Sequence, residues 1–402
     1  MPKVELISNI THFYHTALAL EQAGYLGHYI TGPCALDSEA WMARLGRPVA
    51  RLWSERRLTG LPASKVRRNW LPEVVQKGVL GLGGSPMQSN AMHNVMFGRR
   101  AAAAMADCDV VHFAHSVGLE AARKAKRNGA KVVCDMREEH PLFQQAILAD
   151  EAVRLGVQHV GAGIAYQSRI LEEIDLADTI FCPSSYAKRS FVEQGVPPEK
   201  IVVCPYGVDC DRFSPTGRPS DDPRFTVLFV GNVCARKGVP YLLQGFVRAK
   251  LKGARLLLAG PVDPAFRPLL RDYEGTFEEL GRQPLGMIAS LYQRADVFVV
   301  PSIADVGPLV AFEAMAAGLP TLVSRNTGAS ELIAHGVDGF VVPIRDARAI
   351  ADILVELYEN GDRRAEIGAA AAAKVRLANW AAYRRACAAY YDRLFGVEQP
   401  VR

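Results

Sequence analysis

The 402-residue sequence lacks the marks of several large protein classes. No apolar run approaches the ~20 residues that a membrane-spanning helix needs. The chain enters a strand-like pattern at Lys3, without the charged and apolar regions of a signal peptide. Its eight cysteines are scattered, with no C-x-x-C pair and no Cys/His cluster, which indicates reduced and mostly buried thiols. We therefore expect a cytoplasmic protein.

Motifs for metal-dependent or dinucleotide chemistry are also missing. Asp-x-Asp occurs at 107–109 and 209–211, but the first lies at a helix-to-strand junction and the second in a linker. The glycine-rich stretches 81–84 and 161–163 follow no strand and fail the dinucleotide fingerprint. No Walker lysine and no His-Glu-x-x-His zinc motif occurs. We expect no bound metal ion and no resident cofactor.

Positive charge is plentiful in one place, although the net charge is only +5. Between residues 44 and 68 the single acid is Glu55, and Trp41, Trp53 and Trp70 lie in or beside the segment. Its basic residues are Arg44, Arg47, Arg51, Arg56, Arg57, Lys65, Arg67 and Arg68. Such a segment suits an anionic membrane surface or an anionic acceptor, and a solvated insertion is the alternative. No nucleic-acid recognition module accompanies it, so we expect no nucleic-acid partner.

The length exceeds one ordinary hydrophobic core and predicts two domains. In both halves short apolar runs alternate with helical patterns, which predicts a mostly parallel, doubly wound sheet in each. The segment 207–223 holds three prolines and little apolar content, so it reads as a linker. We expect domains at 1–207 and 208–379. A cleft should lie between them, with the C-terminal ends of both sheets facing it.

Two strand–loop–helix segments of the second half predict anion sites. In 227–246 a strand ends at Gly231, and the loop carries Arg236 and Lys237 into a helix. In 296–318 a strand leads through a loop containing Asp305 into another helix. A helix N-terminus presents free N–H groups and the positive end of the helix dipole to an anion, typically a phosphate.

Glu313 is the unusual residue of the second segment. It lies within the apolar stretch 309–317, where an unpaired carboxylate needs hydrogen-bond donors. It is either a cap or partly exposed helix residue, or an acceptor for the hydroxyls of a bound ligand. The residues alone leave both readings open.

Together the two segments resemble the retaining, GT-B-fold glycosyltransferases of family 4. That family shows Gly-Arg-x-x-x-x-Lys-Gly after a strand, then a Glu-Gly-Phe-Gly loop with a second Glu eight positions after the first. Gly231, Lys237 and Gly238 match the first motif, and Asp305 and Glu313 match the acids of the second. The resemblance covers about residues 105–395 and includes the flanking stretches 177–185, 205–215 and 328–343.

The resemblance implies an α/β fold of two Rossmann-like, doubly wound domains facing a central cleft. A C-terminal helix would cross back, so that 380–402 complete the first domain. The implied reaction moves a sugar from a UDP- or GDP-linked donor to a polysaccharide, lipid-linked glycan or small-molecule acceptor, with retention and without a metal. The alternatives are a non-catalytic relative that acts as a binding partner, and a GT-B phosphorylase or epimerase.

The same resemblance assigns roles in the second half. Lys237 would neutralise the leaving diphosphate, Asp305 would contact the transferred sugar, and Glu313 would accept the ribose hydroxyls. Backbone amides of 307–310 would bind the distal phosphate. The expected donor-binding residues are Gly231, Asn232, Arg236, Lys237, Gly307, Pro308, Leu309, Val310 and Glu313.

The chain departs from the family pattern at three of these places. Asn232 stands where the family has Arg, and Arg236 is the candidate to restore that charge. Asp305 is one methylene shorter than the usual Glu. Pro308 has no N–H, so Leu309 and Val310 must supply the donors to the phosphate.

The first half matches less closely. After its fourth strand the chain reads Asp135-Met-Arg-Glu-Glu-His140-Pro, and we expect His140 at a loop–helix junction facing the cleft. Lys237, Asp305 and His140 form the expected catalytic set. The expected acceptor-side residues are His12, Tyr14, His15 and His115.

Overall fold

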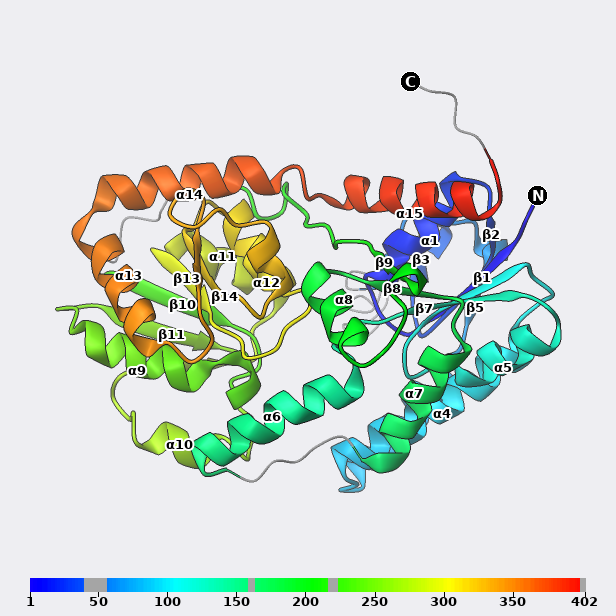
Figure 1. Ribbon diagram of the computed structural model, residues 1–402, viewed down its shortest axis with the longest axis horizontal. Helices are drawn as coiled ribbons and strands as arrows, with labels where there is room; N and C mark the ends of the chain where they lie inside the picture. The colour runs from blue at the N-terminus through cyan, green and yellow to red at the C-terminus, as the bar shows by residue number, and fades with distance from the viewer. Residues whose placement is uncertain (40–55, 158–162, 216–222, 398–402) are drawn as a thin grey trace.

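The computed structural model describes residues 1–39, 56–157, 163–215 and 223–397. It contains two large parallel sheets, one in each half of the chain (Figure 1). The first has the order β5-β2-β1-β6-β7-β8-β9. Its strands are β1 Val4–Ser8, β2 Leu26–Thr31, β5 Val66–Arg68, β6 Val110–Ala114, β7 Lys131–Asp135, β8 Thr179–Cys182 and β9 Ile201–Val203.

The helices of the first half connect these parallel strands. They are α1 Phe13–Gln22, α3 Leu71–Gly81, α4 Pro86–Ala104, α5 Leu119–Arg127, α6 Pro141–Leu155, α7 Ile164–Leu176 and α8 Ser185–Val192. A separate pair of two-residue strands, β3 Ala35–Leu36 and β4 Arg57–Leu58, lies outside the main sheet.

The second sheet has the order β12-β11-β10-β13-β14-β15. Its strands are β10 Thr226–Val230, β11 Arg255–Ala259, β12 Glu278–Gly281, β13 Val297–Val300, β14 Thr321–Ser324 and β15 Phe340–Val342. The helices of the second half are α9 Val239–Ala249, α10 Arg267–Arg271, α11 Leu285–Arg294, α12 Leu309–Ala316, α13 Ala347–Glu359, α14 Gly361–Val375 and α15 Trp380–Leu394.

Each sheet contains one point where the strand order reverses. In the first sheet the chain moves outward from β1 and then returns to place β6 on the other side of β1. The second sheet repeats this scheme with β10 and β13. In open parallel sheets, ligands bind outside the carboxyl ends of the strands at this switch point. The topology therefore marks two places for a site, one in each half.

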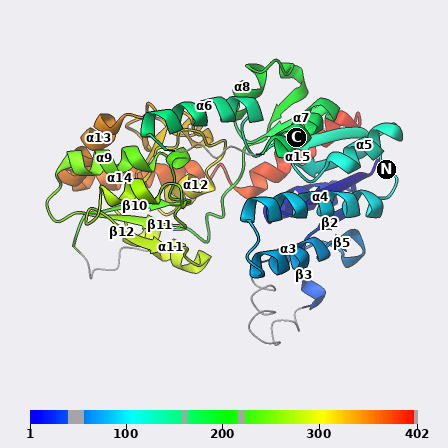
Figure 2. The same cartoon turned by 90° about the horizontal axis from the view of Figure 1, so that it is seen from below.

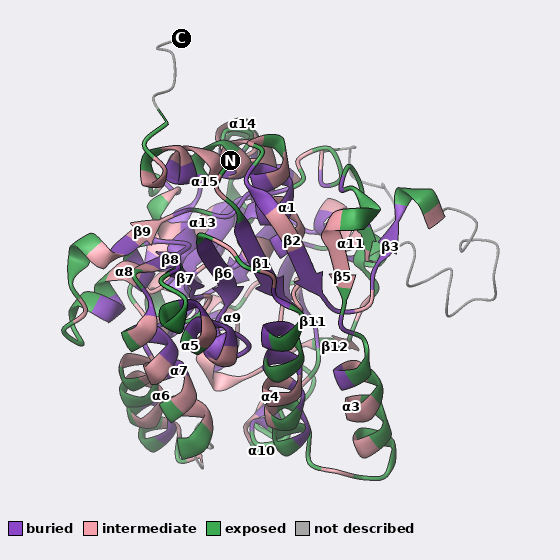
Figure 3. Cartoon of the chain, turned by 90° about the vertical axis from the view of Figure 1, so that its right-hand side faces the viewer, coloured by how far each residue is buried: buried purple, intermediate pink, exposed green. Residues whose placement is uncertain are grey.

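Each sheet has its own hydrophobic core. The strands of a parallel sheet are covered by helices on both faces, so most of their side chains are apolar and buried. Figure 3 shows the central strands of the first sheet buried, while the helices around it keep exposed faces. The second core is built from the strands of the other half and from helices α9 to α14.

The last helix returns to the first half, as expected (Figure 1). The hydroxyls of Tyr383 and Thr16 lie 2.8 Å apart, and that of Tyr391 lies 2.7 Å from Nδ1 of His112. Cys387 adds a fully buried side chain to the same core. The chain therefore has the GT-B architecture of two Rossmann-like domains with a helix that crosses back. The exact domain boundaries stay a prediction.

The described part of the basic segment does not form a free cationic patch. Residues 44–55 lie outside the described residues. Among the others, four cations form ion pairs with acids at 2.5–2.7 Å, namely Arg56–Glu73, Arg57–Asp37, Lys65–Glu21 and Arg68–Glu39. Within the described ranges, no helix has the length and hydropathy needed to span a bilayer.

A candidate donor site and an acceptor cavity

The two loops singled out from the sequence meet at the switch point of the second sheet. The loop after β10 contains a short 3-10 helix, Ala235–Lys237, and the loop after β13 runs from Pro301 to Pro308. The N–H of Ile303 donates to the Arg236 carbonyl at 2.8 Å, and Nη1 of Arg236 donates to the Ala304 carbonyl at 3.0 Å. These bonds hold the two loops together.

Lys237 and Asp305 are joined directly. The Lys237 ammonium forms an ion pair with the Asp305 carboxylate, which also accepts the hydroxyl of Ser302 at 3.3 Å. The Lys237 side chain is 14% exposed and that of Asp305 is 9% exposed, so solvent screens the pair only weakly. The expected catalytic lysine and acid are thus neighbours.

The N-terminus of α12 lies beside this pair. Pro308 is its N-cap, with no side-chain cap. Among the hydrogen bonds of the described residues, none uses the backbone N–H of Leu309 or Val310. The loop before it is fixed, because the Asp305 N–H donates to the Asn326 carbonyl at 3.1 Å. Two N–H groups without a partner in the described chain and the positive end of a helix dipole therefore lie at the end of a fixed loop.

Glu313 has a donor within the protein. The Tyr292 hydroxyl lies 3.0 Å from Oε2 of Glu313. Burial raises the pKa of the Glu313 carboxyl, while the hydrogen bond from Tyr292 and the charge of Arg212 oppose that rise. The other carboxylate oxygen remains available for a ligand hydroxyl.

Asn232 and Gly231 lie at the end of β10. Gly231 has φ +143°, which favours glycine, and its N–H donates to the Ala259 carbonyl at 2.9 Å. Asn232 and Arg236 both line a cavity of about 580 Å³ between this loop and α6. The Arg236 side chain lies nearer to the Asp305 loop, through its bond to Ala304.

His140 occupies a structural position. Its Nδ1 accepts the N–H of Leu142 at 3.3 Å, which makes His140 the N-cap of α6. Its own N–H donates to the hydroxyl of Ser190 at 3.0 Å, and its ring packs edge-on against Phe191. These contacts all lie within the first half. A catalytic role for His140 stays a prediction that this placement does not favour.

Three of the four acceptor-side residues lie on or next to α1. His15 stacks on Trp380, with ring centroids 4.0 Å apart. His12, the N-cap of α1, lies between Tyr206 and Trp380. The hydroxyl of Tyr14 donates to the Thr59 carbonyl at 2.6 Å. The two histidines therefore pack where the chain crosses between halves.

His115 is in a different place, at the switch point of the first sheet. There a cavity of about 580 Å³ is lined by residues that follow β1, β6 and β7, including Asn9, His115 and Arg137. Side chains and backbone of α3, α4 and α7 complete it, among them Asn94 and Tyr166. Amides, an arginine and an aromatic ring suit a polyhydroxylated ligand.

Two residues near these sites had no sequence motif to reveal them. The Arg137 guanidinium has a buried Nε without a hydrogen-bond partner in the described chain. Glu139 is 2% exposed, and only its Oε2 has a donor, the Gln144 amide at 2.8 Å. Burial raises the pKa of the Glu139 carboxyl, and the charge of Asp305 adds to the rise. Both lie in the Arg-Glu-Glu-His stretch, where adjacent charged residues after a strand were the only signal.

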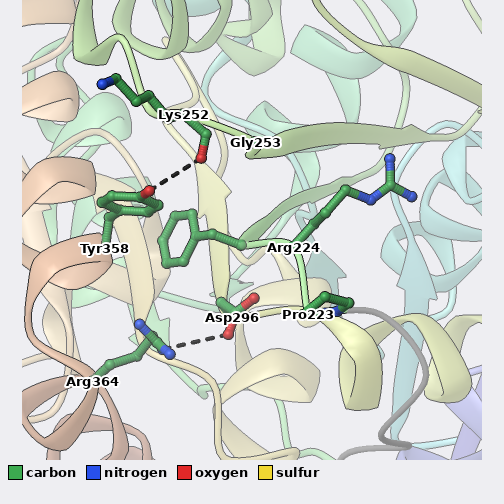
Figure 4. Close-up of a pocket in the computed structure, with 8 residues that line it drawn as sticks. Pro223, Arg224, Lys252, Gly253, Asp296, Tyr358 and Arg364 are labelled. Atoms are coloured by element: carbon green, nitrogen blue, oxygen red, sulfur yellow. Dashed lines mark hydrogen bonds and ion pairs between the residues drawn. The ribbon is translucent and has the colours of Figure 1, made fainter.

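A further pocket of about 360 Å³ lies at the opposite edge of the second sheet, where the amino ends of its strands lie (Figure 4). Arg364 forms an ion pair with Asp296 at 3.4 Å, and its guanidinium lies over the ring of Phe225. Tyr358 donates its hydroxyl to the Lys252 carbonyl at 3.1 Å. These groups are engaged with one another and lie at the amino ends of β10 and β13, whereas the loops with Lys237 and Asp305 follow the carboxyl ends of these strands. In the described ranges no cluster of His, Cys, Asp or Glu is arranged to hold a metal ion.

Comparison with known proteins agrees with this geometry. A family model described as Glycosyltransferase Family 4 matches residues 11–212, and one described as Glycosyl transferases group 1 matches residues 224–360. The chain belongs to glycosyltransferase family 4. Among solved structures of similar fold, sucrose-phosphate synthase from Thermosynechococcus elongatus has a TM-score of 0.67 at 20% identity, covering 99% of this chain and 100% of that one.

Another solved structure, Anabaena HepE in complex with UDP and glucose, has a TM-score of 0.65 at 16% identity and covers 98% and 100% of the two chains. Among curated relatives, WcaL of Salmonella typhimurium, named for colanic acid biosynthesis, is 32% identical over 174 residues, 40% of this chain and 43% of WcaL. The amylovoran biosynthesis glycosyltransferase AmsK of Erwinia amylovora is 28% identical over 200 residues, 47% and 49% of the two chains. This family 4 chain spans about half the length of these relatives.

Proposed function

We propose that this protein transfers a sugar from a nucleoside-diphosphate sugar to a hydroxyl of an acceptor. One observation carries the proposal. At the switch point of the second sheet, Lys237, Asp305 and the free N-terminus of α12 lie together, and Glu313 projects from the same helix. A cation, a helix dipole and a carboxylate in this order suit a diphosphate that joins a sugar to a ribose.

Donor binding would rearrange the ion pair. We propose that the diphosphate replaces Asp305 as the partner of Lys237, which frees the Asp305 carboxylate to accept hydroxyls of the transferred sugar. The N–H groups of Leu309 and Val310 bind the distal phosphate, and the free oxygen of Glu313 accepts a ribose hydroxyl. Arg236 keeps the loop in place and adds positive potential.

The chemical step follows from this arrangement. The bond between the anomeric carbon and the phosphate oxygen breaks, and the acceptor oxygen bonds to the same face of that carbon, so that configuration is retained. The acceptor proton passes to the leaving phosphate oxygen. The charge that develops on the diphosphate is stabilised by Lys237 and by the dipole of α12, both fixed before reaction. In this proposal they do the work that a metal ion does in other transferases.

We propose that the acceptor binds in the cavity at the first switch point. The carboxamides of Asn9 and Asn94 match sugar hydroxyls, and the buried Nε of Arg137, which has no hydrogen-bond partner in the described chain, can donate to an oxygen of the ligand. WcaL and AmsK are named for polysaccharide biosynthesis, and a relative from Mycobacterium tuberculosis is named a GDP-mannose-dependent phosphatidylinositol monomannoside mannosyltransferase. These names favour a polysaccharide or lipid-linked glycan as the acceptor and GDP as the carrier, and the HepE complex with UDP and glucose supports UDP as the other candidate.

A peripheral position on the inner face of the membrane remains part of the proposal. It rests on the arginines of 44–55 and on α3, whose Val74 is 53% exposed, with Trp70 and Leu82 also exposed beside it. Co-sedimentation with vesicles, with and without anionic lipid, tests it. If neutralising Arg44, Arg47 and Arg51 leaves binding unchanged, this segment is not the anchor.

A nucleotide panel tests the donor site. Thermal unfolding with UDP, GDP and ADP should reveal one nucleotide that stabilises the protein by about 2.7 kcal/mol at a hundred times its Kd.

The substitution Lys237→Ala should lower turnover about 100-fold, as the loss of one transition-state donor does in other enzymes. Lys252→Ala, at the opposite edge of the sheet, is the matched control. Turnover unchanged in Lys237→Ala, or no nucleotide binding at all, would contradict the proposal.

Product analysis with a labelled donor separates the alternatives. Transfer predicts label in the acceptor and release of the nucleoside diphosphate. A phosphorylase would give a sugar phosphate and an epimerase an isomerised donor. A non-catalytic relative would bind the nucleotide without releasing the diphosphate from its sugar.

A further inference from the structure

The N-terminus of α8, in the first half, is capped by a residue of the second half. Ser184 is its local N-cap and accepts the N–H of Ala187 at 3.1 Å. The earlier N–H groups, of Ser185 and Tyr186, donate to the two carboxylate oxygens of Glu331 at 2.9 and 2.6 Å. Glu331 lies 146 residues from Ser185 in the sequence.

This contact has the geometry of a strong interaction. A carboxylate at a helix N-terminus gains from free N–H groups and from the helix dipole. Here each oxygen of Glu331 receives one N–H, so both bonds are charge-assisted. If the two halves moved apart, water would have to replace Glu331 at the first turn of α8.

A second contact ties the same helix end to the expected phosphate loop. The hydroxyl of Ser184 donates to the Val306 carbonyl at 2.7 Å. Val306 lies between Asp305, the partner of Lys237, and Gly307. The N-terminus of α8 is therefore attached to the loop that precedes α12.

Close backbone packing makes this junction stiff. Glu331 belongs to the short 3-10 helix Gly328–Glu331, and the Gly328 N–H donates to the Asp305 carbonyl at 2.9 Å. A Cβ at Gly328 would lie 2.0 Å from the Val306 carbonyl oxygen and 2.8 Å from Cβ of Ser184. Three segments from both halves thus meet with no space for a side chain between them. The loop cannot shift without disturbing α8 or the 3-10 helix.

We infer that Glu331 is a positioning residue for the donor loop. By capping α8, it holds residues 305–308 in the shape that binds the diphosphate, so diphosphate binding and contact between the two halves favour each other. The inference rests on the proposed function, since it concerns the same donor site. Coupling of this kind is reciprocal: the contact strengthens diphosphate binding by the same factor as bound diphosphate strengthens the contact.

The test compares the nucleoside diphosphate found in the panel with its parent nucleoside, by titration calorimetry and by competition. Glu331→Ala should weaken diphosphate binding about tenfold, the equivalent of one charge-assisted bond. Glu331→Gln, which keeps one acceptor oxygen, should lose less. Nucleoside binding should be unchanged in both, because the side-chain hydrogen bonds found for Glu313 and Tyr292 in the described chain stay within α11 and α12 and do not reach Ser184, Val306 or Glu331. Glu366→Ala, on the exposed face of α14, is the matched control.

Each outcome decides the matter. Equal loss for nucleoside and diphosphate would show a merely structural role and overturn the inference, and so would unchanged binding of both. If Glu331→Ala does not fold, Glu331→Gln and Ser184→Ala give the same comparison. A wild-type protein that binds no nucleotide would overturn the proposed function itself, whereas normal wild-type binding with unaffected variants overturns only the coupling.

Discussion

At the scale of single residues, burial determines which histidines of the first half can move protons. Burial lowers the pKa of His12 and of His115 to about 4, and that of His15 to about 3. The nearby charges of Arg137 and Arg384 push in the same direction. All three rings are therefore neutral at pH 7 and weak bases. They suit hydrogen bonding and stacking, and they do not suit general base catalysis at neutral pH.

These pKa values predict how stability depends on pH. The folded protein binds the three protons less readily than the unfolded chain, whose histidines titrate near 6.5. The free energy of unfolding should therefore fall as pH drops from about 6.5 toward 4. Thermal unfolding measured across this range tests the effect, and His115→Asn should flatten the slope. The substitution His335→Asn, at a surface residue, is the control. A free energy of unfolding that stays constant between pH 7 and 5 would contradict the prediction.

The Tyr292 hydroxyl is expected to hold Glu313 in place for the ribose. In Tyr292→Phe the carboxylate loses its donor at 3.0 Å, so burial raises its pKa further and its orientation is less fixed. We expect nucleoside diphosphate affinity to fall about tenfold, in line with the loss of one hydrogen bond to a charged group. Tyr358→Phe, which removes a similar bond at the far edge of the sheet (Figure 4), should leave affinity unchanged. Equal nucleoside diphosphate affinities in the two variants would show that Tyr292 does not contribute to nucleotide binding.

At the scale of elements, the sequence predicted best where its signal was local. The strand–loop–helix segments around Lys237 and Asp305 are periodic and bounded by glycine and proline, and both appear where expected. The short edge strands β5 and β12 were missed, because each has a single large apolar residue beside charged ones and so shows no apolar run. Glu331 was recognised only as part of a motif. Its contact with α8 joins residues far apart in sequence, and no local pattern specifies such a pair.

Gly238 shows how an element fixes a site residue. It has φ +71°, and a Cβ there would lie 1.9 Å from the carbonyl oxygen of Pro301. Gly238→Ala should therefore displace Lys237 and reduce both stability and diphosphate binding. Gly253→Ala is a matched control, since its φ is +68° but its Cβ would meet nothing within 4 Å. The control should lose only about 1 kcal/mol of stability, which is the cost of holding alanine at a positive φ. Equal effects of the two substitutions would show that the contact with Pro301 does not matter.

At the scale of the whole molecule, the two halves are joined by more than the crossing segments. Helix α6 belongs to the first half in sequence, but it lies against the second (Figure 1, Figure 2). Ile147 of α6 packs on the second hydrophobic core. Arg345, which follows β15, pairs with Glu151 at 2.6 Å and with Asp150 at 2.7 Å. Together with Glu331 and α8, this contact brings the halves together on both sides of the donor loop.

Arg345 is therefore expected to stabilise the arrangement of the two halves. Glu151 is 1% exposed, and removal of its partner leaves a buried carboxylate unpaired, which costs about 3–5 kcal/mol in comparable cases. Arg345 also has φ +66°, so Arg345→Gly relieves backbone strain that Arg345→Ala keeps. We expect both variants to unfold at lower temperature and to have a larger radius of gyration by small-angle scattering, with Ala affected more than Gly. Arg348→Ala, which removes an exposed pair with Asp352, should change neither quantity. A radius of gyration unchanged in all three variants would show that α6 does not hold the halves together, and the coupling between them would then be assigned to the contacts of Glu331 and Val306 with the N-terminus of α8.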